Sequence, residues 1–440
     1  MRHLGKPLRI AYVGGGSMFV ASIAHGIAAS MAPPDAPAFA AELALVDPDT
    51  ERAERMADYV GVLARSRRLP LAADVRSPAA ALDGADLVLC SAGLPERGAR
   101  LEAIYERLGW AGPAEGPGAV AAAVAMGPFF LGLAREAVGR CPGAPLVSLV
   151  DPTDVLAGAA RRRFGHAGLR PLGLCVEVEG LRGALAFGFG VPEEDVTLVH
   201  GGVNHVGWVA RFLVAGRDGY ADLGGDLAAL GGRAGMHPAN RMISEIYGLT
   251  GLIRSSAYHA WPLVLTDAPP EAEGAVFPNK GRFHREALNA ALEAGRPIPE
   301  PPRCHPEASP LHYPGTGRAV GRMARALATG EAAVVALQLP YAGEALGWSP
   351  EITVEVPAVV THAGIDPVQI GPLPPGVDGL PRMLGQQRAM GSDYLAGPDE
   401  PALRRALAAT PQWGSVGQIR ALAAALHAEF GAELDAAVCG

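Results

Sequence analysis

The sequence predicts an α/β protein built on a doubly wound parallel sheet of the Rossmann type, followed by a second half of mixed α+β structure. Three observations support this prediction. A glycine-rich turn follows the first apolar run, an aspartate ends the second, and apolar runs then alternate with helix-like stretches as far as Val150. With 440 residues, the chain is also long enough for two packed domains.

The first predicted strand, Leu8–Val13, runs into a glycine turn, and a helix-like stretch rich in Ala and Ile follows, Ala21–Ala29. The first and third residues of this turn are glycines, as in a dinucleotide-binding fingerprint, because a missing side chain lets the backbone approach a pyrophosphate. Phenylalanine takes the place of the fingerprint's last glycine. The cofactor contacts predicted here are Gly14, Gly16, Ser17, Met18 and Phe19.

A second predicted strand, Leu43–Val46, ends in Asp47. A carboxylate there can accept hydrogen bonds from a ribose diol and repel a 2′-phosphate, which favours NAD over NADP. An ordinary turn beside a solvated aspartate is the alternative. Two further strands, Leu87–Ser91 and Leu146–Val150, bring more loops to the carboxyl edge of the sheet, where ligands of such folds bind. The cofactor contacts predicted in these loops are Ser91, Ala92, Gly93 and Asp151.

Beyond Asp151 the strict alternation stops, and a mixed second half is expected. Two strands are predicted around an Asn-His turn, and a further pair of β segments is expected to associate. The predicted strands are Val196–Val199, Trp208–Val214, Ala332–Gln338 and Ile352–Val356. The predicted helices are Ala239–Tyr247, Arg285–Ala294, Arg318–Ala328, Pro401–Ala408 and Ser415–Phe430. We expect residues 1–190 to form a nucleotide-binding domain and residues 191–440 a catalytic and oligomerisation domain.

Composition argues against several classes of partner. The formal net charge is -8 and there is no basic run, so nucleic-acid binding is not expected. The most apolar stretch, Ala119–Leu133, is too short for a membrane helix and contains Gly127 and Pro128. The five cysteines are odd in number and scattered, which favours a reducing compartment and predicts a cytoplasmic protein.

Seven segments spread along the chain carry a resemblance to a known family. They are Gly14-Gly15-Gly16-Ser17, Leu45-Val46-Asp47, Arg100 with the following helix to Gly109, Gly173-Leu174-Cys175, Gly202-Val203-Asn204-His205, Val354-Glu355-Val356-Pro357-Ala358 and Gly371-Pro372-Leu373-Pro374. With them the chain resembles the NAD- and divalent-metal-dependent family 4 glycoside hydrolases, the α-galactosidase and 6-phospho-glucosidase type, as a divergent member. The resemblance implies a fold like that of lactate and malate dehydrogenases and a homodimer or homotetramer.

The resemblance also implies a metal site, commonly for manganese, at Cys175 and His205. A thiolate and a neutral imidazole can hold such an ion and leave positions open for sugar hydroxyls. Taken alone, each residue has a simpler interpretation: a buried cysteine behaves as a small apolar side chain, and a buried histidine as a satisfied polar one.

The chemistry that the resemblance implies is a redox elimination on a small-molecule glycoside, an exception to the two-carboxylate scheme of most glycosidases. NAD oxidises the sugar at C3, a tyrosine removes the C2 proton, the aglycone leaves C1, water adds, and NADH returns the hydride. The best match for the base is Tyr258, with Tyr247 as the alternative, and Asp151 also belongs to the catalytic set. The predicted substrate contacts are Arg97, Glu115, Asn204 and Lys280.

Three departures from the family's pattern bear on function. Val176 follows the metal cysteine where the family commonly has Asp, Asn or His, and valine cannot donate a proton. Asp151-Pro152 stands where the family has Asn-Pro. Lys280 is one of two lysines in a chain otherwise rich in arginine, which suggests either an anionic sugar substituent or a solvated loop residue. Two alternatives therefore remain: an NAD-dependent sugar or hydroxy-acid dehydrogenase, and an inactive NAD-binding protein.

Overall fold

The computed structural model describes residues 6–31, 39–110, 115–232, 238–255, 280–300, 309–410 and 415–439. Within these residues one mixed sheet of twelve strands runs through the protein, in the order β3-β2-β1-β4-β5-β6-β10-β11-β7-β8-β9, with β12 paired to β11. The strands are β1 (Leu8–Val13), β2 (Ala41–Val46), β3 (Leu71–Val75), β4 (Leu87–Cys90), β5 (Pro145–Ser148), β6 (Arg170–Gly173), β7 (Val196–Val203), β8 (Val206–Val214), β9 (Arg217–Asp218), β10 (Ala333–Leu339), β11 (Val354–Val360) and β12 (Ile365–Pro367).

The first six strands are parallel and form the doubly wound half of the sheet. All four residues of β4 and all four of β5 are buried, as expected for strands covered by helices on both faces. The covering helices are α1 (Phe19–Met31), α2 (Thr50–Arg67), α3 (Pro78–Leu82), α4 (Pro95–Leu108), α5 (Pro117–Arg140) and α6 (Thr153–Phe164). The predicted Rossmann-type sheet is confirmed, with β3 and β6 as strands that the sequence patterns did not reveal.

The second half extends the same sheet with antiparallel strands. One residue pair, Gln338 with Gly173, joins β10 to β6, and another, Glu355 with Gly202, joins β11 to β7. The predicted pairing of the segments around Ala336 and Val356 is confirmed as β10 with β11. The helices described here are α7 (Glu177–Phe189), α8 (Gly224–Ala229), α9 (Pro238–Thr250), α11 (Lys280–Ala294), α12 (Pro314–Thr329), α13 (Gly379–Ala396), α14 (Glu400–Ala408) and α15 (Val416–Cys439).

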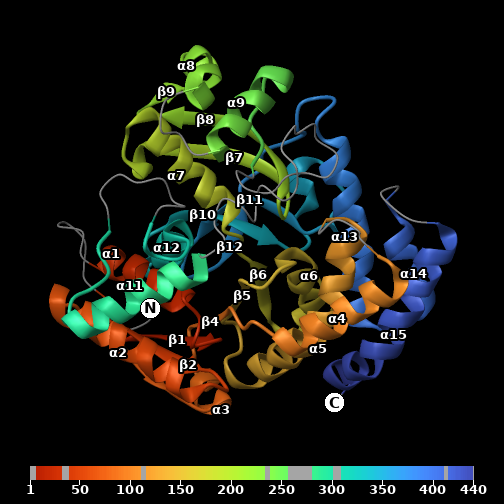
Figure 1. The fold of residues 1–440 in the computed structure, drawn as a ribbon, viewed down its shortest axis with the longest axis horizontal. Coiled ribbons are helices and arrows are strands. Elements are labelled where there is room, and N and C mark those ends of the chain that lie inside the picture. Colours follow the sequence, from red (N-terminus) through yellow and green to blue (C-terminus); the bar gives the residue numbers. More distant parts are fainter. Residues whose placement is uncertain are drawn as a thin grey trace.

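The C-terminal helices return to pack on the first half of the chain. Figure 1 shows α14 and α15, in blue, beside α4 and α5, in orange, and α12 contacts α1 while α13 contacts α6. Helix α5 is long and apolar enough to cross a membrane, but 72% of its most apolar window is buried inside the fold, as in a core helix. The sheet passes without interruption from one half to the other, and a boundary near residue 190 stays a prediction.

The contact between α1 and α12 depends on glycine. A Cβ placed on Gly26 of α1 would lie 1.8 Å from the carbonyl oxygen of Gly317 in α12, and a Cβ on Gly321 would lie 2.1 Å from the carbonyl oxygen of Gly26. The two backbones therefore touch directly, and this contact fixes α1, the helix that begins at the glycine turn, against the second half of the chain.

We expect the Gly26→Ala substitution to lower the free energy of unfolding by about 3 kcal/mol, because the added methyl group forces two helix backbones apart. Gly98→Ala in α4 is the matched control: no atom lies within 4 Å of its added Cβ. That change should raise stability by about 0.5–1 kcal/mol through helix propensity. Urea denaturation measures both effects, and a Gly26→Ala protein as stable as the unmodified chain would contradict this account of the helix contact.

Candidate functional site

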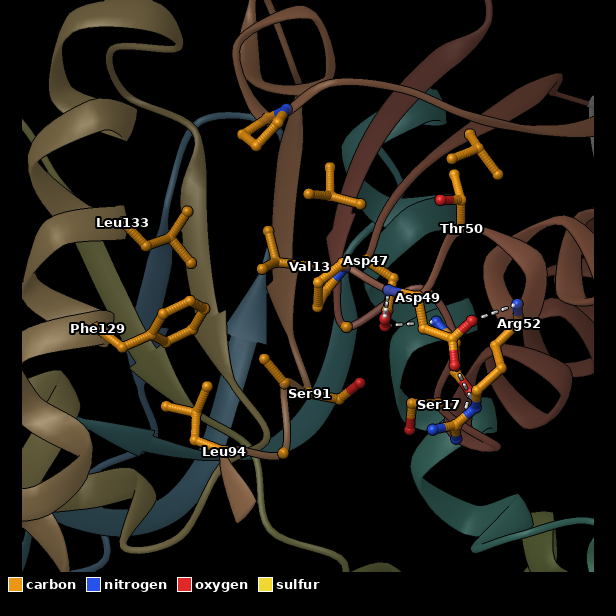
Figure 2. Close-up of a pocket in the computed structure, with 18 of the residues that line it drawn as sticks. Val13, Ser17, Asp47, Asp49, Thr50, Arg52, Ser91, Leu94, Phe129 and Leu133 are labelled. Carbon is orange, nitrogen blue, oxygen red and sulfur yellow. Dashed lines mark hydrogen bonds and ion pairs between the residues drawn. The ribbon is translucent and has the colours of Figure 1, made fainter. Parts of the chain in front are cut away.

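A cavity of about 1450 Å³ lies along the carboxyl edge of the parallel strands, around the glycine turn. Figure 2 shows apolar side chains of Leu94, Phe129 and Leu133 on one side of it and the polar side chains of Asp47, Asp49 and Arg52 on the other. One apolar wall and one polar wall suit a ligand that combines a flat ring with hydroxyl and phosphate groups. The predicted cofactor residues that line the cavity are Gly14, Gly16, Ser17, Met18, Asp47, Ser91, Ala92 and Gly93.

The glycine turn leaves no room for side chains. Gly14 has a φ of 94°, and a Cβ on it would lie 2.7 Å from the backbone nitrogen of Ala92. A Cβ on Gly16 would lie 3.0 Å from the Cβ of Arg52. Helix α1 begins at Phe19, directly after Ser17 and Met18, which line the cavity, so the N-terminus of this helix lies beside it. This is the arrangement in which a helix N-terminus binds an anion such as a pyrophosphate.

Asp47 has a structural role that the sequence patterns did not reveal. Its carboxylate accepts hydrogen bonds from the backbone N–H of Gly16 at 2.8 Å and from that of Asp49 at 3.0 Å. Arg52 completes the link, since its guanidinium donates to the carbonyl oxygen of Gly16 at 3.1 Å. The end of β2 therefore fixes the shape of the glycine turn, while the carboxylate of Asp47 still lines the cavity.

A second group of side chains lies at the same edge of the sheet. Asp151 follows β5, Cys175 follows β6, and His205 lies in the turn between β7 and β8 with a left-handed φ of 63°. One ligand atom from each of these residues lies within 4.8 Å of the other two. Sulfur, nitrogen and oxygen atoms at this spacing can be bound by one ion at ordinary ligand distances.

Burial and mutual charge perturb two of these three groups. Burial raises the pKa of the Cys175 thiol to about 12, and nearby His205 offsets only part of that rise. Burial acts to lower the pKa of His205, but Cys175 and Asp151 outweigh it and hold the pKa well above its ordinary value. Cation binding at such a cysteine and histidine is coupled to the release of protons, because the ligand forms are a thiolate and an imidazole with a free nitrogen lone pair.

A buried ion-pair network holds His205 from behind. Its Nδ1 lies 2.8 Å from Oε1 of Glu115, and the other oxygen of Glu115 accepts from the guanidinium of Arg388. Arg388 also donates to Asp154 at 2.7 Å and to the carbonyl oxygen of Asn204 at 2.7 Å. Because an ionised carboxylate only accepts, Nδ1–H of His205 donates to Glu115, and Nε2 lies on the other side of the ring, 3.7 Å from Oδ1 of Asp151.

A second chain of hydrogen bonds holds the neighbouring asparagine. The amide of Asn204 donates to Oδ1 of Asp151 at 2.9 Å, and its oxygen accepts from Gln338 at 2.7 Å. Gln338 also donates to Glu355 at 3.0 Å and accepts from the hydroxyl of Thr153. Burial raises the pKa of Glu355 to about 7, although the bond from Gln338 works against that rise. The side chains around the cluster are thus fixed by neighbours from several strands.

Two family models match this chain. The model described as family 4 glycosyl hydrolase matches residues 9–188, and the model of that family's C-terminal domain matches residues 200–391. Together they cover both the glycine turn and the Asp-Cys-His cluster. The chain belongs to the family 4 glycosyl hydrolases. A search of the curated proteins found no match to this chain.

Solved structures agree with the family fold. A 6-phospho-β-glucosidase from Thermotoga maritima, with manganese, NAD+ and glucose-6-phosphate, is 18% identical with a TM-score of 0.72, over 96% of this chain and 99% of that one. A 6-phospho-α-glucosidase from gut microorganisms, with NAD and glucose-6-phosphate, is 17% identical with a TM-score of 0.75, over 97% and 99%. A lactate dehydrogenase from a deep-sea metagenome library is 13% identical with a TM-score of 0.51, over 88% and 100%. The predicted lactate dehydrogenase-like fold is confirmed.

Several residues assigned from the sequence of this family 4 glycosyl hydrolase have other contacts. Phe19 packs its ring on His312 and Tyr313, with centroids 4.7 and 5.5 Å away, and does not line the cavity. Arg97 donates to Glu433 of α15 at 2.5 Å and to the carbonyl oxygen of Ala125. These contacts explain both positions through packing, and their assignment to cofactor and substrate stays a prediction.

The remaining predicted substrate and base residues lie either beside the cluster, outside the described residues or in a separate core. Glu115 and Asn204 lie in the site, but their polar atoms bond to the side chains around the cluster. Lys280 begins α11, and its side chain lies outside the described residues, as does Tyr258. Tyr247, the alternative base, stacks on Tyr220 at 6.0 Å between centroids, in the small core around α7, β8 and α9.

The residues after Cys175 form a helix. Val176 is the N-cap residue of α7, and Glu177 is its first residue and is 1% exposed. Arg388 and Asp154 were not assigned a role from the sequence, and they support the cluster indirectly, through Glu115 and Asn204, which bond to it. No local pattern marks either of them, since each is a single charged residue within a helix.

The geometry fits both groups that the family implies. The glycine turn is a cradle that any Cβ would fill, which suits a dinucleotide pyrophosphate. The Asp-Cys-His cluster offers three ligand atoms from side chains already fixed by hydrogen bonds. Because β1, β4, β5 and β6 are adjacent parallel strands, the turn, the Ser91 loop, Asp151 and Cys175 follow one another along one edge of the sheet.

Proposed function

We propose that this chain cleaves a small glycoside by oxidation at the sugar C3, elimination and water addition, with NAD and a divalent metal, Mn²⁺, as cofactors. The observation that carries the proposal is the cluster of Cys175, His205 and Asp151 at the edge of the sheet that also holds the glycine turn. Membership of the family 4 glycosyl hydrolases supports it. So does the presence of NAD+ and manganese in the similar 6-phospho-β-glucosidase structure.

When bound, NAD supplies a hydride acceptor and the divalent ion a Lewis acid for the oxidised sugar. The side chains and backbone of the protein bind NAD and the divalent ion and orient them relative to the sugar. The turn from Gly14 to Ser17 and the N-terminus of α1 bind the pyrophosphate, and Asp47 accepts from the ribose hydroxyls. Cys175 and His205 would hold the ion, and Glu115 fixes the imidazole by accepting from its Nδ1, which keeps Nε2 available as the ligand atom.

We assign proton abstraction from C2 to Tyr258, which lies three positions after Ser255 and outside the described residues. The substrate is a small glycoside, and the similar structures that contain glucose-6-phosphate favour an anionic sugar. Lys280, at the start of α11, and Asn204, at the cluster, are the proposed substrate contacts. We place the protein in the cytoplasm as a homodimer or homotetramer; the four described cysteines are free thiols, as a reducing compartment requires.

A panel of charged and neutral aryl glycosides tests the proposal. We expect release of the aglycone only when NAD and Mn²⁺ are both present, and exchange of deuterium at the sugar C2 with solvent during turnover. The rate should fall to background after dialysis against a chelator and recover when Mn²⁺ is added. Cleavage that continues unchanged after both NAD and metal have been removed would rule out this function.

A second candidate function is a dehydrogenase that oxidises a sugar or hydroxy acid without hydrolysis. Val176 favours it, because the residue after Cys175 has no proton to give to a leaving group and Glu177 is buried. This function predicts free NADH in proportion to substrate consumed. The redox elimination returns the hydride, so it predicts no such accumulation.

A further inference from the structure

Asp151 occupies the position at which the family's Asn-Pro pair has an amide, and it faces the same point as the two metal ligands proposed above. Its Oδ1 lies 3.7 Å from Nε2 of His205, and its carboxylate is within 4.8 Å of Sγ of Cys175. The side chain of Asp151 is 57% exposed, whereas that of His205 is 8% exposed. Asp151 therefore closes the cluster on its open side, next to solvent.

The carboxylate is held in this place by its neighbours. The amide of Asn204 donates to Oδ1 of Asp151, and Gln338 in turn orients that amide through its oxygen. Gln338 is itself fixed by Thr153 and Glu355. A carboxylate oxygen has two acceptor positions, so Oδ1 can keep its bond to Asn204 and still bind an ion. Among the described residues, none donates a hydrogen bond to Oδ2.

Charge gives the carboxylate a distinct effect. With an amide at this position, one thiolate and one imidazole leave a net charge of +1 on a bound divalent ion. With Asp151 the two anionic ligands cancel that charge, which lowers the cost of holding the ion among buried side chains. An S, N, O set also leaves about three of the six positions of an octahedral ion such as Mn²⁺ for sugar oxygens and water.

We propose that Asp151 is a third protein ligand of the catalytic metal, so that this chain retains its ion without substrate. The inference rests on the proposed function, since it needs Cys175 and His205 to be the other two ligands. The alternative role of Asp151 is to accept hydrogen bonds from the sugar. Loss of that role would weaken substrate binding and leave the affinity for the metal unchanged.

Calorimetric titration of Mn²⁺ into the chelator-treated full chain, with NAD present and sugar absent, tests the inference. We expect one Mn²⁺ per chain in the unmodified protein. Asp151→Asn should weaken binding by about 100-fold, at the upper end of what the loss of a supporting residue costs. Asp151→Glu should restore part of the affinity, because it returns the carboxylate. Asp58→Asn, at an exposed site on α2, removes the same charge elsewhere and should change nothing.

The cysteine variant separates this inference from the proposed function. Cys175→Ala should abolish Mn²⁺ binding. If it does and Asp151→Asn binds Mn²⁺ as tightly as the unmodified protein, Asp151 is not a ligand and the proposed function stands. If Cys175→Ala also binds Mn²⁺ normally, both proposals are wrong. Asp151 is half exposed, so the variants should fold, and far-ultraviolet circular dichroism checks that they do. If Asp151→Asn does not fold, Asp151→Ala removes the same carboxylate and is titrated in its place.

Discussion

Replacing Cys175 with alanine is expected to lower the rate of glycoside cleavage by about 1000-fold or more. The sulfur atom is buried and lies among His205 and Asp151, where it supplies the anionic ligand that the side chain of alanine lacks. Loss of Lewis-acid stabilisation costs several kcal/mol, and about 4 kcal/mol corresponds to about 1000-fold in rate. Steady-state kinetics with saturating NAD and Mn²⁺ measures the effect.

Cys141→Ala is the control for this change. Cys141 is also a buried free thiol, but it lies at the C-terminal end of α5, in the core between α5 and its neighbours. Its replacement removes the same atoms from the interior without touching the cluster, so cleavage should continue at nearly the unmodified rate. Equal activity in the two cysteine variants would remove the thiolate from the proposed mechanism.

Replacing Arg388 with methionine is expected to lower the free energy of unfolding by about 3–5 kcal/mol, as for other broken buried ion pairs. Arg388 is 2% exposed and bridges Asp154 and Glu115, which are themselves 1% and 5% exposed. Without the guanidinium, two carboxylates remain buried with no cation between them. Glu115 would also lose the partner that orients it toward His205, so Mn²⁺ affinity should fall by about 10- to 100-fold.

Arg140→Met tests whether the losses of stability and of Mn²⁺ affinity depend on the burial of the arginine. Arg140 also bridges two acids, Asp83 and Glu136, but this group lies at the surface, where water competes for every partner. Its replacement should leave both the urea midpoint and the Mn²⁺ affinity close to the unmodified values. A result in which Arg388→Met and Arg140→Met have similar stabilities would show that the buried network is not what holds His205 in place.

The sequence predicts those parts of the fold that have a local cause. The strand before Gly14, the glycine turn and the strand ending at Asp47 each follow from adjacent residues, because burial of apolar side chains and the steric freedom of glycine act over short distances. The sequence patterns did not predict helix α13, because its residues carry no such local signal. Several of its buried positions are polar or glycine, among them Gly385, Gln387 and Arg388, so it has no apolar stripe to reveal it.

The same distinction holds for the site. Cys175 and His205 are in short motifs that resemble the family, and these motifs predict the two residues individually. Asp154 and Arg388, which support the cluster through Asn204 and Glu115, are 234 positions apart in the chain, and only the folded arrangement of α6 and α13 brings them together. Asp47 shows an intermediate case: its place at the strand end was predicted, but its bonds to two backbone N–H groups depend on the three-dimensional turn.

The central claim is that Cys175 and His205 share one ion at the edge of the sheet that binds NAD. Anomalous scattering from crystals grown with NAD and Mn²⁺ tests it most directly. We predict a single strong manganese peak about 2–2.5 Å from Sγ of Cys175 and Nε2 of His205, with the dinucleotide in the cavity beside Gly14. A dinucleotide bound in that cavity with no peak between these two side chains, or a peak elsewhere, would contradict the account.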